Sequence, residues 1–291
     1  MNLEELEQRR PSVFHNLLPA KRVTVHRETL VEDVMDAYRK DTSFIHHKID
    51  VTFKEENAID LQGLTREMFT TFFNLIFLKF FFGRNEKAPC FDIKILFNGT
   101  FEIIGKIISH CFVLTNYLPP KLSKAIYSII STKACRDETF LHSYFNVVSE
   151  DEEMLIKNAM NCTKITEDIK CKLFNLVDDY GGCEPINHQN DVKPVVLSLA
   201  KASLYARPLL SISNLKKGMW CYSILWNNVT LKILEEYLQK LRPSIDKVLS
   251  IISCQFTDDQ TNRTQEERIL NYMEQYIRSL SEKELATLLK F

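Results

Sequence analysis

Alternating and helical patterns of apolar residues divide the first part of the chain into strands and helices. Apolar and polar residues alternate in RVTVH (22–26) and in KIDVTFKE (48–55), as expected for half-buried strands that could pair. Between them, residues 27–38 place apolar side chains at helical spacing. The pattern therefore predicts a strand, a helix and a second strand, in this order.

The strongest helical pattern is MFTTFFNLIFLKFFFG (68–83). Its apolar residues form one continuous stripe, and further leucines and phenylalanines stand on other faces. We expect a core helix that is buried nearly all round, with Phe72, Phe73, Ile76 and Phe77 at its centre. The alternatives are a helix that lines a partner groove and a membrane span. A span needs about 20 apolar residues, and this run is shorter and contains two threonines, an asparagine and a lysine.

Helical patterns dominate the rest of the chain. Residues 101–130 predict two helices that are separated at Pro119-Pro120, and Gly105 inside the first predicts close packing against another backbone. Three Ser/Thr-x-x-Glu segments have the spacing of capping boxes that begin helices: Ser149–Glu152, Thr264–Glu267 and Ser281–Glu284.

The clearest loop is DDYGGCEPINHQND (178–191), which is rich in Gly, Pro, Asn and Asp. We therefore predict a flexible N-terminal segment over residues 1–20, a large subdomain over 21–180 and a second helical subdomain over 181–291. The expected fold class is mainly α with a few short β-strands (α+β).

Composition and charge favour a protein partner. The 37 Lys and Arg residues nearly balance the 38 Asp and Glu residues, so no net field favours nucleic acid or an anionic membrane surface. The 8 cysteines contain no CxxC pair of the kind that zinc sites use, and the N-terminus has no apolar signal segment. We predict reduced thiols, a location in the cytoplasm or nucleus, and neither nucleic-acid nor membrane binding.

No set of side chains assembles a complete active site. Cys183 and His188 stand five residues apart in the loop without an orienting third group, and His46 and His47 are adjacent, which predicts a surface pair that diverges. We predict no catalytic residue, no metal ligand and no cofactor.

The stretch VTFKEENAIDLQGLTREMFTTFFNLIF (51–77) resembles the signature of the HECT family of ubiquitin ligases. In the N-lobe of that family, a strand ends in an acidic turn, an Asp-x-Gly-Gly segment follows, and Arg-Glu-Phe begins a helix. The counterparts here are Asp60, Gly63, Arg66, Glu67 and Phe69, while Gln62 replaces the first glycine and Met68 the usual aromatic residue.

Three further stretches are similar to parts of the same lobe: RVTVHRETLVEDV (22–34), FEIIGKIISH (101–110) with its internal Gly105, and ISNLKKGM (212–219). We interpret the signature residues as structural. A buried Arg66 and Glu67 would tie the turn between strand and helix to neighbouring backbone, and Gly63 would permit a close approach.

The final segment, residues 253–291, resembles the approach to the C-lobe in a divergent HECT branch. In that branch a Leu-x-x-Leu-Leu-x-Phe helix precedes a Thr-Gly strand and, much later, the Thr-Cys motif that carries the catalytic cysteine. None of the 8 cysteines here has that context. The resemblance implies a bilobal, HECT N-lobe-like architecture with the start of a truncated C-lobe and without the acceptor cysteine.

The resemblance also implies a function. In HECT ligases a conjugating enzyme passes ubiquitin from its thioester to a ligase cysteine, which a substrate lysine then attacks. The implied partners are a ubiquitin-conjugating enzyme, ubiquitin and a protein substrate, and this chain alone is predicted to be inactive. One alternative is a non-catalytic interaction protein that kept the HECT fold. Another is a helical domain with accidental similarity.

In the family, the conjugating enzyme binds a small subdomain of the N-lobe, where a loop side chain of the enzyme fills an apolar groove. We expect the part that follows the Gly-Gly loop to host this contact. Its candidate exposed aromatics are Tyr205, Trp220, Tyr222 and Trp226. The six-residue spacing of the two tryptophans puts them on nearly opposite sides of a helix, which favours packing anchors over a ligand cage.

Overall fold

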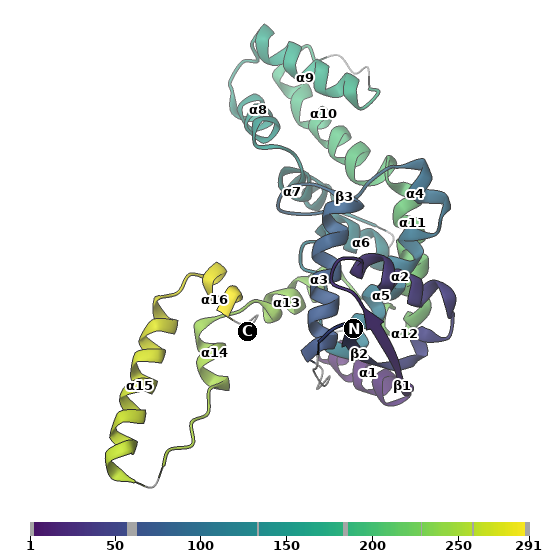
Figure 1. Cartoon of the computed structure of the whole chain (residues 1–291). Helices are drawn as coiled ribbons and strands as arrows, with labels where there is room; N and C mark the ends of the chain where they lie inside the picture. Colours follow the sequence, from purple (N-terminus) through teal and green to yellow (C-terminus); the bar gives the residue numbers. More distant parts are fainter. Residues whose placement is uncertain are drawn as a thin grey trace. The chain divides into compact units, whose positions relative to one another are not determined.

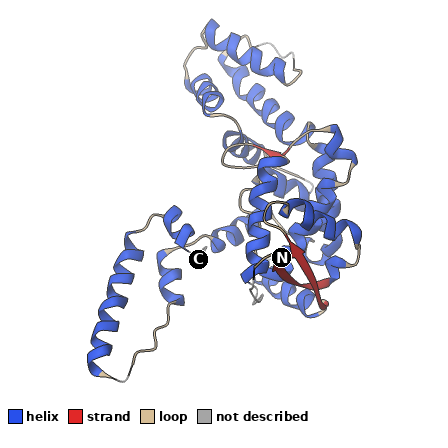
Figure 2. Cartoon of the chain, viewed as in Figure 1, coloured by secondary structure: helices blue, strands red, loops and turns tan. Residues whose placement is uncertain are grey.

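The computed structural model describes residues 3–56, 63–132, 134–182, 186–227, 229–257 and 259–288. Helices make up most of the described chain, and the strands are few and short (Figure 1, Figure 2). The predicted class, mainly α with a few short β-strands, is therefore confirmed.

The elements follow one another without long irregular segments. The first helices are α1 (Leu3–His15), α2 (Leu30–Lys40), α3 (Gly63–Lys79), α4 (Ile93–Phe97), α5 (Thr100–Thr115) and α6 (Lys124–Thr132). They are followed by α7 (Asp137–Val147), α8 (Glu150–Asn161), α9 (Glu167–Asp179), α10 (Gln189–Lys201), α11 (Leu209–Met219), α12 (Ser223–Trp226), α13 (Leu231–Leu241), α14 (Ile245–Ile251), α15 (Gln260–Ser279) and α16 (Glu282–Leu288). The strands are β1 (Leu18–Val25), β2 (His47–Phe53), β3 (Phe81–Phe82) and β4 (Ala88–Pro89), and three short helical turns are η1 (Phe44–His46), the π-helix η2 (Ala202–Ala206) and η3 (Trp220–Tyr222).

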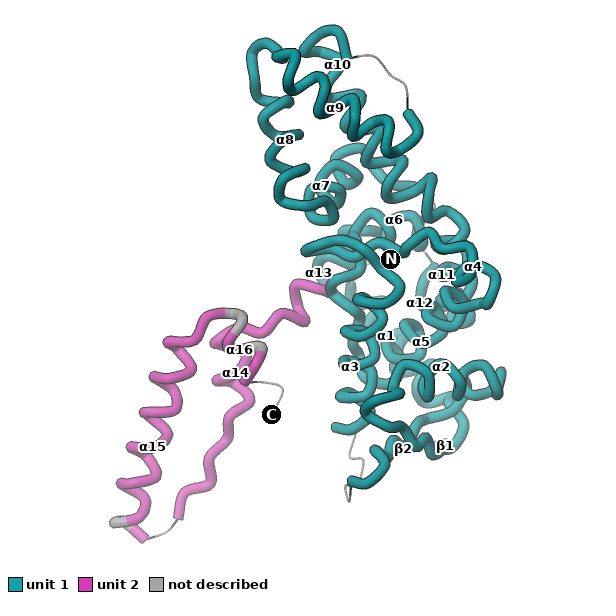
Figure 3. The backbone as a smooth tube through the Cα atoms, turned by 45° about the horizontal axis from the view of Figure 1, so that its top comes forward, with its two compact units in different colours: residues 1–236 teal, residues 237–291 magenta. Residues whose placement is uncertain are grey.

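The chain forms two compact units, residues 1–236 and residues 237–291 (Figure 3). This division differs from the predicted boundary at residue 180, because α10 packs on α7 and α8, which precede the Gly-Gly loop. Gly181 takes a left-handed conformation, with φ of 71°, and the Gly182 N–H donates to the Val177 carbonyl at 3.0 Å. The glycines therefore end α9 in a tight turn within the first unit.

Strands β1 and β2 pair in parallel, with Val23 opposite Val51 and Val25 opposite Phe53. Parallel strands cannot be joined by a tight hairpin, and here α2 lies in the connection between them. Val25, Val51 and Phe53 are buried on one face. The expected strand, helix and strand are confirmed.

The segment before residue 20 is ordered, which corrects the predicted flexible N-terminus. Residues 3–15 form α1, which packs against α5 and α12, and Leu6 is fully buried. Two arginines fix the helix: Arg9 Nη1 donates to the Ile224 carbonyl at 3.0 Å, and Arg10 Nη1 to the Val113 carbonyl at 2.7 Å. The polar composition misled the prediction because α1 is held by side-chain hydrogen bonds as well as by apolar burial.

Helix α3 buries the expected stripe and exposes its opposite face. Phe72, Phe73 and Ile76 are at most 1 % exposed, and Phe77 is also buried. Leu78, by contrast, is 79 % exposed. The prediction that this helix is buried nearly all round was wrong, because α2, β2 and α5 cover one side of it.

The most deeply buried helix is α5, and its main partner is α11. A Cβ added to Gly105 would stand 2.1 Å from the Leu215 carbonyl oxygen, and one added to Gly218 would stand 1.9 Å from the Glu102 carbonyl oxygen. Two glycines therefore let the two backbones touch where the helices cross. The predicted close approach at Gly105 is confirmed.

Hydrogen bonds satisfy the polar groups of this core. His110 is fully buried, and its Nε2 lies 2.8 Å from the His47 carbonyl oxygen while its Nδ1 lies 2.7 Å from the Tyr38 hydroxyl. Since a carbonyl oxygen only accepts, Nε2 carries the proton and Nδ1 accepts from Tyr38. Burial lowers the pKa of His110 to about 3, so the ring is neutral.

Four helices, α7 to α10, form what we call the outer helical layer (residues 137–201; Figure 1). Helix α10 contacts α7 and α8, and α8 contacts α9. The predicted capping box at the start of α8 is confirmed: the Glu152 N–H donates to Ser149 Oγ at 3.2 Å, and the Ser149 N–H donates to the Glu152 carboxylate at 2.9 Å.

The second unit has a small core of Val248, Ile277 and Leu285. The Ser281 N–H donates to the Glu284 carboxylate at 2.8 Å, which confirms that cap. The cap predicted at Thr264 was wrong, because α15 already begins at Gln260.

Among the described helices, none is by itself long and apolar enough to cross a membrane. The pair Gln189–Ala206 and Leu209–Trp226, bent by 50° at its break, meets the criterion by length and composition only. Val196, Leu204 and Leu215 of this pair are buried in the first unit.

Candidate functional site

The Arg-Glu pair of the signature lies at the surface. Arg66 is exposed, and the Glu67 carboxylate accepts from Arg27 Nη1 at 2.7 Å. Arg27 also binds Glu56 and stacks on the ring of Phe53, 4.4 Å from the ring centroid. Hydrogen bonds from Glu56 and Glu67 raise the pKa of Arg27.

The expectation that Arg66 and Glu67 are buried and bonded to backbone was therefore wrong. Thr65, Met68 and Phe69 point into the core, which turns the two residues between them toward solvent. Glu67 still joins α3 to the end of β1, but it does so through the side chain of Arg27. Exposed ion pairs of this kind contribute little stability, so their role is local ordering.

The other signature residues divide between core and surface. Phe69 is fully buried, as expected for a residue that anchors α3. A Cβ added to Gly63 would meet no atom of the described residues within 4 Å, which gives no support to the close approach expected there. Asp60 lies outside the described residues.

Two of the four aromatic candidates for partner binding belong to the core. Trp226 is 1 % exposed and donates its indole N–H to Ser109 Oγ at 2.8 Å, and Tyr222 is buried and donates to the Ile45 carbonyl. Trp220 is partly buried, and only Tyr205, at 42 %, is clearly exposed. The prediction that these aromatics form an exposed set was wrong, because the chain turns at η3 and folds Tyr222 and Trp226 back onto α5 and its neighbours.

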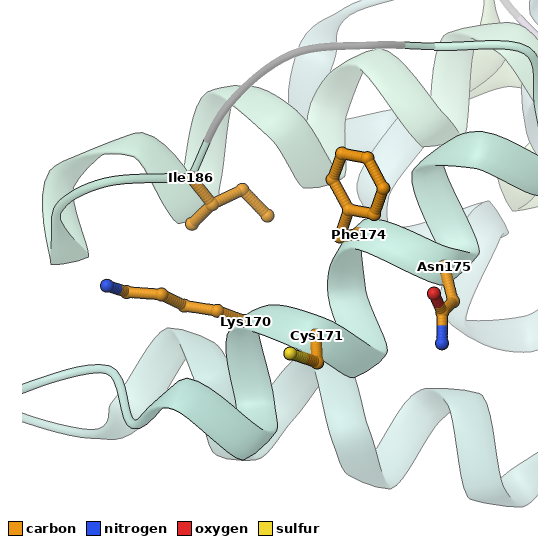
Figure 4. A pocket seen from close by; sticks show the side chains of 5 residues that line it. All are labelled: Lys170, Cys171, Phe174, Asn175 and Ile186. Carbon is orange, nitrogen blue, oxygen red and sulfur yellow. The ribbon is translucent and has the colours of Figure 1, made fainter.

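The outer helical layer carries a small apolar groove, which we call the α9 groove. It is lined by Lys170, Cys171, Phe174 and Asn175 of α9 and by Ile186, which precedes α10, and has a volume of about 300 Å³ (Figure 4). Phe174 is 50 % exposed, whereas Ile186 is buried and lies across from the α9 side chains. A half-exposed aromatic ring beside a buried aliphatic side chain leaves room for one apolar group.

The helical pattern of α9 explains why Phe174 is available. Leu173, Leu176 and Val177 are buried on the inner face, so Phe174 projects outward. The helix begins at a Thr166 cap whose hydroxyl accepts the Ile169 N–H at 3.4 Å. We did not predict this groove from the sequence. The signal was present in IKCKLFNLV (169–177), where the phenylalanine stands off the apolar face.

The described thiols offer no activated nucleophile of the kind that a lowered pKa would produce. All seven cysteines in the described ranges are free. Burial raises the pKa of Cys111 to about 12 and that of Cys135 to about 11, and it also raises the pKa of Cys90. A thiol with a raised pKa is protonated at neutral pH and is a poor nucleophile. Cys183 lies outside the described residues.

Neither a metal site nor a paired-histidine site is formed by the side chains that the structure describes. No group of three or more His, Cys, Asp or Glu residues gathers there in a way that would hold a metal ion. His46 contacts the ring of Tyr222, while His47 Nδ1 lies 2.9 Å from the Pro19 carbonyl oxygen. The two adjacent histidines therefore diverge, as predicted.

Comparison of the sequence with protein-family models gave no match, and comparison with curated proteins gave none either.

Proposed function

We propose that this chain is the N-lobe-like part of a HECT-type ubiquitin ligase, and that its outer helical layer docks a ubiquitin-conjugating enzyme. The sequence supports this through the signature of residues 51–77. The fold is consistent with it: a strand precedes the signature, α3 follows it with Phe69 buried, and Gly105 sits at a helix crossing.

The observation that carries the docking proposal is the α9 groove. In the HECT family, a loop of the conjugating enzyme inserts an apolar side chain into an apolar groove of a small N-lobe subdomain. The α9 groove has a matching size and character, with Phe174 half-exposed above a buried Ile186. An enzyme side chain that filled it would bury the exposed ring of Phe174, and aromatic residues in such positions are common binding hot spots.

In this proposal the chain binds and positions the charged conjugating enzyme, and carries out no transfer step of its own. Ubiquitin would pass from the enzyme thioester to a cysteine outside the residues discussed here, and then to a lysine of the protein substrate. The raised pKa values of Cys111 and Cys135 agree with that division of labour. The proposed place of action is the cytoplasm or nucleus.

The test is a titration of the full chain with a panel of fluorescently labelled ubiquitin-conjugating enzymes, followed by anisotropy. We expect at least one enzyme to bind. Phe174→Ala should weaken that binding by about 30-fold, the effect of a hot-spot truncation of about 2 kcal/mol. Leu78→Ala is the matched control, because Leu78 is an exposed apolar residue on α3, away from the groove.

Tyr205→Ala separates the α9 groove from the originally expected location. Tyr205 is exposed and lies in the π-helix that follows α10. Loss of binding in Tyr205→Ala together with normal binding in Phe174→Ala would move the docking site out of the groove. No binding by any enzyme at high micromolar concentration would reject the proposal.

A further inference from the structure

A second hollow lies on the first unit, apart from the α9 groove. We call it the Arg207 pocket. Its walls are Phe82 of β3, Pro89 of β4, Phe91, Tyr180 at the end of α9, Arg207 and Pro208, and its volume is about 630 Å³. Pockets of about 300 to 1,000 Å³ with apolar walls and a few polar groups are typical of binding sites.

The guanidinium of Arg207 is held at this pocket by two contacts. It stacks on the ring of Tyr180, with its central carbon 4.4 Å from the ring centroid, and Nη2 donates to the Asp179 carbonyl. Arg207 forms no ion pair with any residue in the described part of the chain. A fixed arginine without a carboxylate partner is a ready site for an acidic group, because arginine stays charged and binds carboxylates in a fork.

The backbone at the pocket is unusual. Residues 202–206 form the π-helix η2, and the Arg207 N–H donates to the Ala202 carbonyl at 3.0 Å. This turn places Ser203, which lines the pocket, 3.4 Å from the Tyr180 hydroxyl. Single π-turns within helices are frequent at functional sites.

A buried hydroxyl next to the pocket supports the same ring. Tyr144 is fully buried, and its hydroxyl has no hydrogen-bond partner among the residues that the structure describes. Burial raises the pKa of Tyr144, and the neighbouring Tyr180 raises it further. Tyr180 is therefore held by packing on one side, and its ring face is available to Arg207 on the other.

The apolar surface extends beyond the pocket along α4. Phe91, Ile93 and Phe97 are 58 %, 63 % and 82 % exposed, and Leu210 is 55 % exposed. The segment is fixed to α11, because Ser211 Oγ donates to the Cys90 carbonyl at 2.9 Å. A run of exposed apolar side chains on a fixed backbone marks an interaction surface, and it is longer than a small metabolite would need.

We propose that the Arg207 pocket and the α4 surface bind a short extended segment of a partner protein, in which an acidic side chain stands next to a proline or aromatic residue. The carboxylate pairs with Arg207. The proline or aromatic ring packs between Phe82 and Phe91. Extended proline-containing segments suit aromatic-lined grooves because their conformation is preformed. This site shares no lining residue with the α9 groove, so the proposal does not rest on conjugating-enzyme docking.

The test is an array of 12-residue peptides, probed with the full chain. One set places Asp or Glu beside Pro, Phe or Trp, and the matched set replaces each acid by Asn or Gln. Peptides of the first set should bind, and the acid-to-amide change should weaken them by about tenfold or more, as expected for a lost charge-assisted pair. Arg207→Gln and Phe91→Ser should each reduce binding by a similar factor.

Both changes are at exposed side chains, and circular dichroism will confirm that the variants fold. Phe174→Ser is the control that separates the two proposals, because it alters the α9 groove and should leave peptide binding unchanged. Equal binding of acidic and amide peptides would overturn the proposal. So would binding that survives in both Arg207→Gln and Phe91→Ser, or binding of no peptide at all.

Discussion

Alanine in place of Gly105 or Gly218 should separate α5 from α11. The added Cβ would stand about 2 Å from a backbone carbonyl oxygen at either position, where at least 3.0 Å is needed. Backbone oxygens in a helix cannot rotate away as a flexible side chain can. The two helices must therefore move apart by about 1 Å at their crossing.

The cost of this movement can be set against the helix propensity of alanine. A gap of about 1 Å forfeits up to about half of the dispersion attraction between facing atoms, and overpacked cores lose typically about 1 to 3 kcal/mol. Because α5 and α11 share the most extensive helix contact of the first unit, we take the upper value. Alanine returns about 1 kcal/mol through propensity. The net loss is about 2 kcal/mol for either change.

Urea denaturation followed by tryptophan fluorescence measures this loss where it occurs. Trp226 donates to Ser109 of α5, and Trp220 directly follows α11, so the two tryptophans of the chain report on the crossing. With a denaturant slope of about 3 kcal/mol per molar, each variant should lower the unfolding midpoint by roughly 0.7 M.

Gly63→Ala is the matched control. The same chemical change at the start of α3 meets no described atom within 4 Å, so it should leave the midpoint unchanged or raise it slightly. An unchanged midpoint in both Gly105→Ala and Gly218→Ala would show that the two backbones are not in contact, and would refute the packing argument.

Three further predictions concern the core, its pH dependence and its chemistry. Phe73→Ala should cost about 3 to 5 kcal/mol as a cavity mutation, seen as a lower urea midpoint; an unchanged midpoint would mean that the stripe is not buried. Stability should fall as the pH drops from 6.5 toward about 3, since the folded state keeps His110 neutral while the unfolded chain binds the proton. The slope from this residue is at most about 1.4 kcal/mol per pH unit, and His110→Gln should flatten it; an identical slope in the variant would assign the effect elsewhere. Incubated with activating enzyme, charged conjugating enzymes and ubiquitin, the chain should form no thiol-sensitive ubiquitin adduct on gels; an adduct abolished by one Cys→Ser change would identify an acceptor.

The parts of the fold that were predictable are those in which local pattern and tertiary packing agree. The stripe around Phe73 is long enough to define one buried face, and the alternation in β1 and β2 matches their buried residues. Gly105 stands where no local reason favours glycine, so its packing role could be inferred. The sequence could not show that Gly218 would be its counterpart, because the two residues are neighbours only after folding.

The candidate sites were harder to predict because exposure depends on where neighbouring helices lie. Tyr222 and Trp226 look like surface aromatics in a short, interrupted helical segment, yet the turn at η3 buries both. Phe174 was overlooked for the opposite reason, since a single phenylalanine among leucines suggests core. The Arg207 pocket joins segments from β3, the end of α9 and the π-helix, and no local pattern links them.

The helix crossing at Gly105 and Gly218 also sets a delay during protein synthesis. Ser109 of α5 bonds to the Met219 carbonyl at the end of α11, 110 positions later in the chain. At about 5 to 20 residues per second, a ribosome needs on the order of 5 to 20 seconds to make that stretch. Throughout this time α5 has emerged without its main partner, with an apolar surface that the finished protein hides. A chaperone that recognises nascent apolar helices would therefore meet this chain first at α5, and would release it once α11 has left the ribosome.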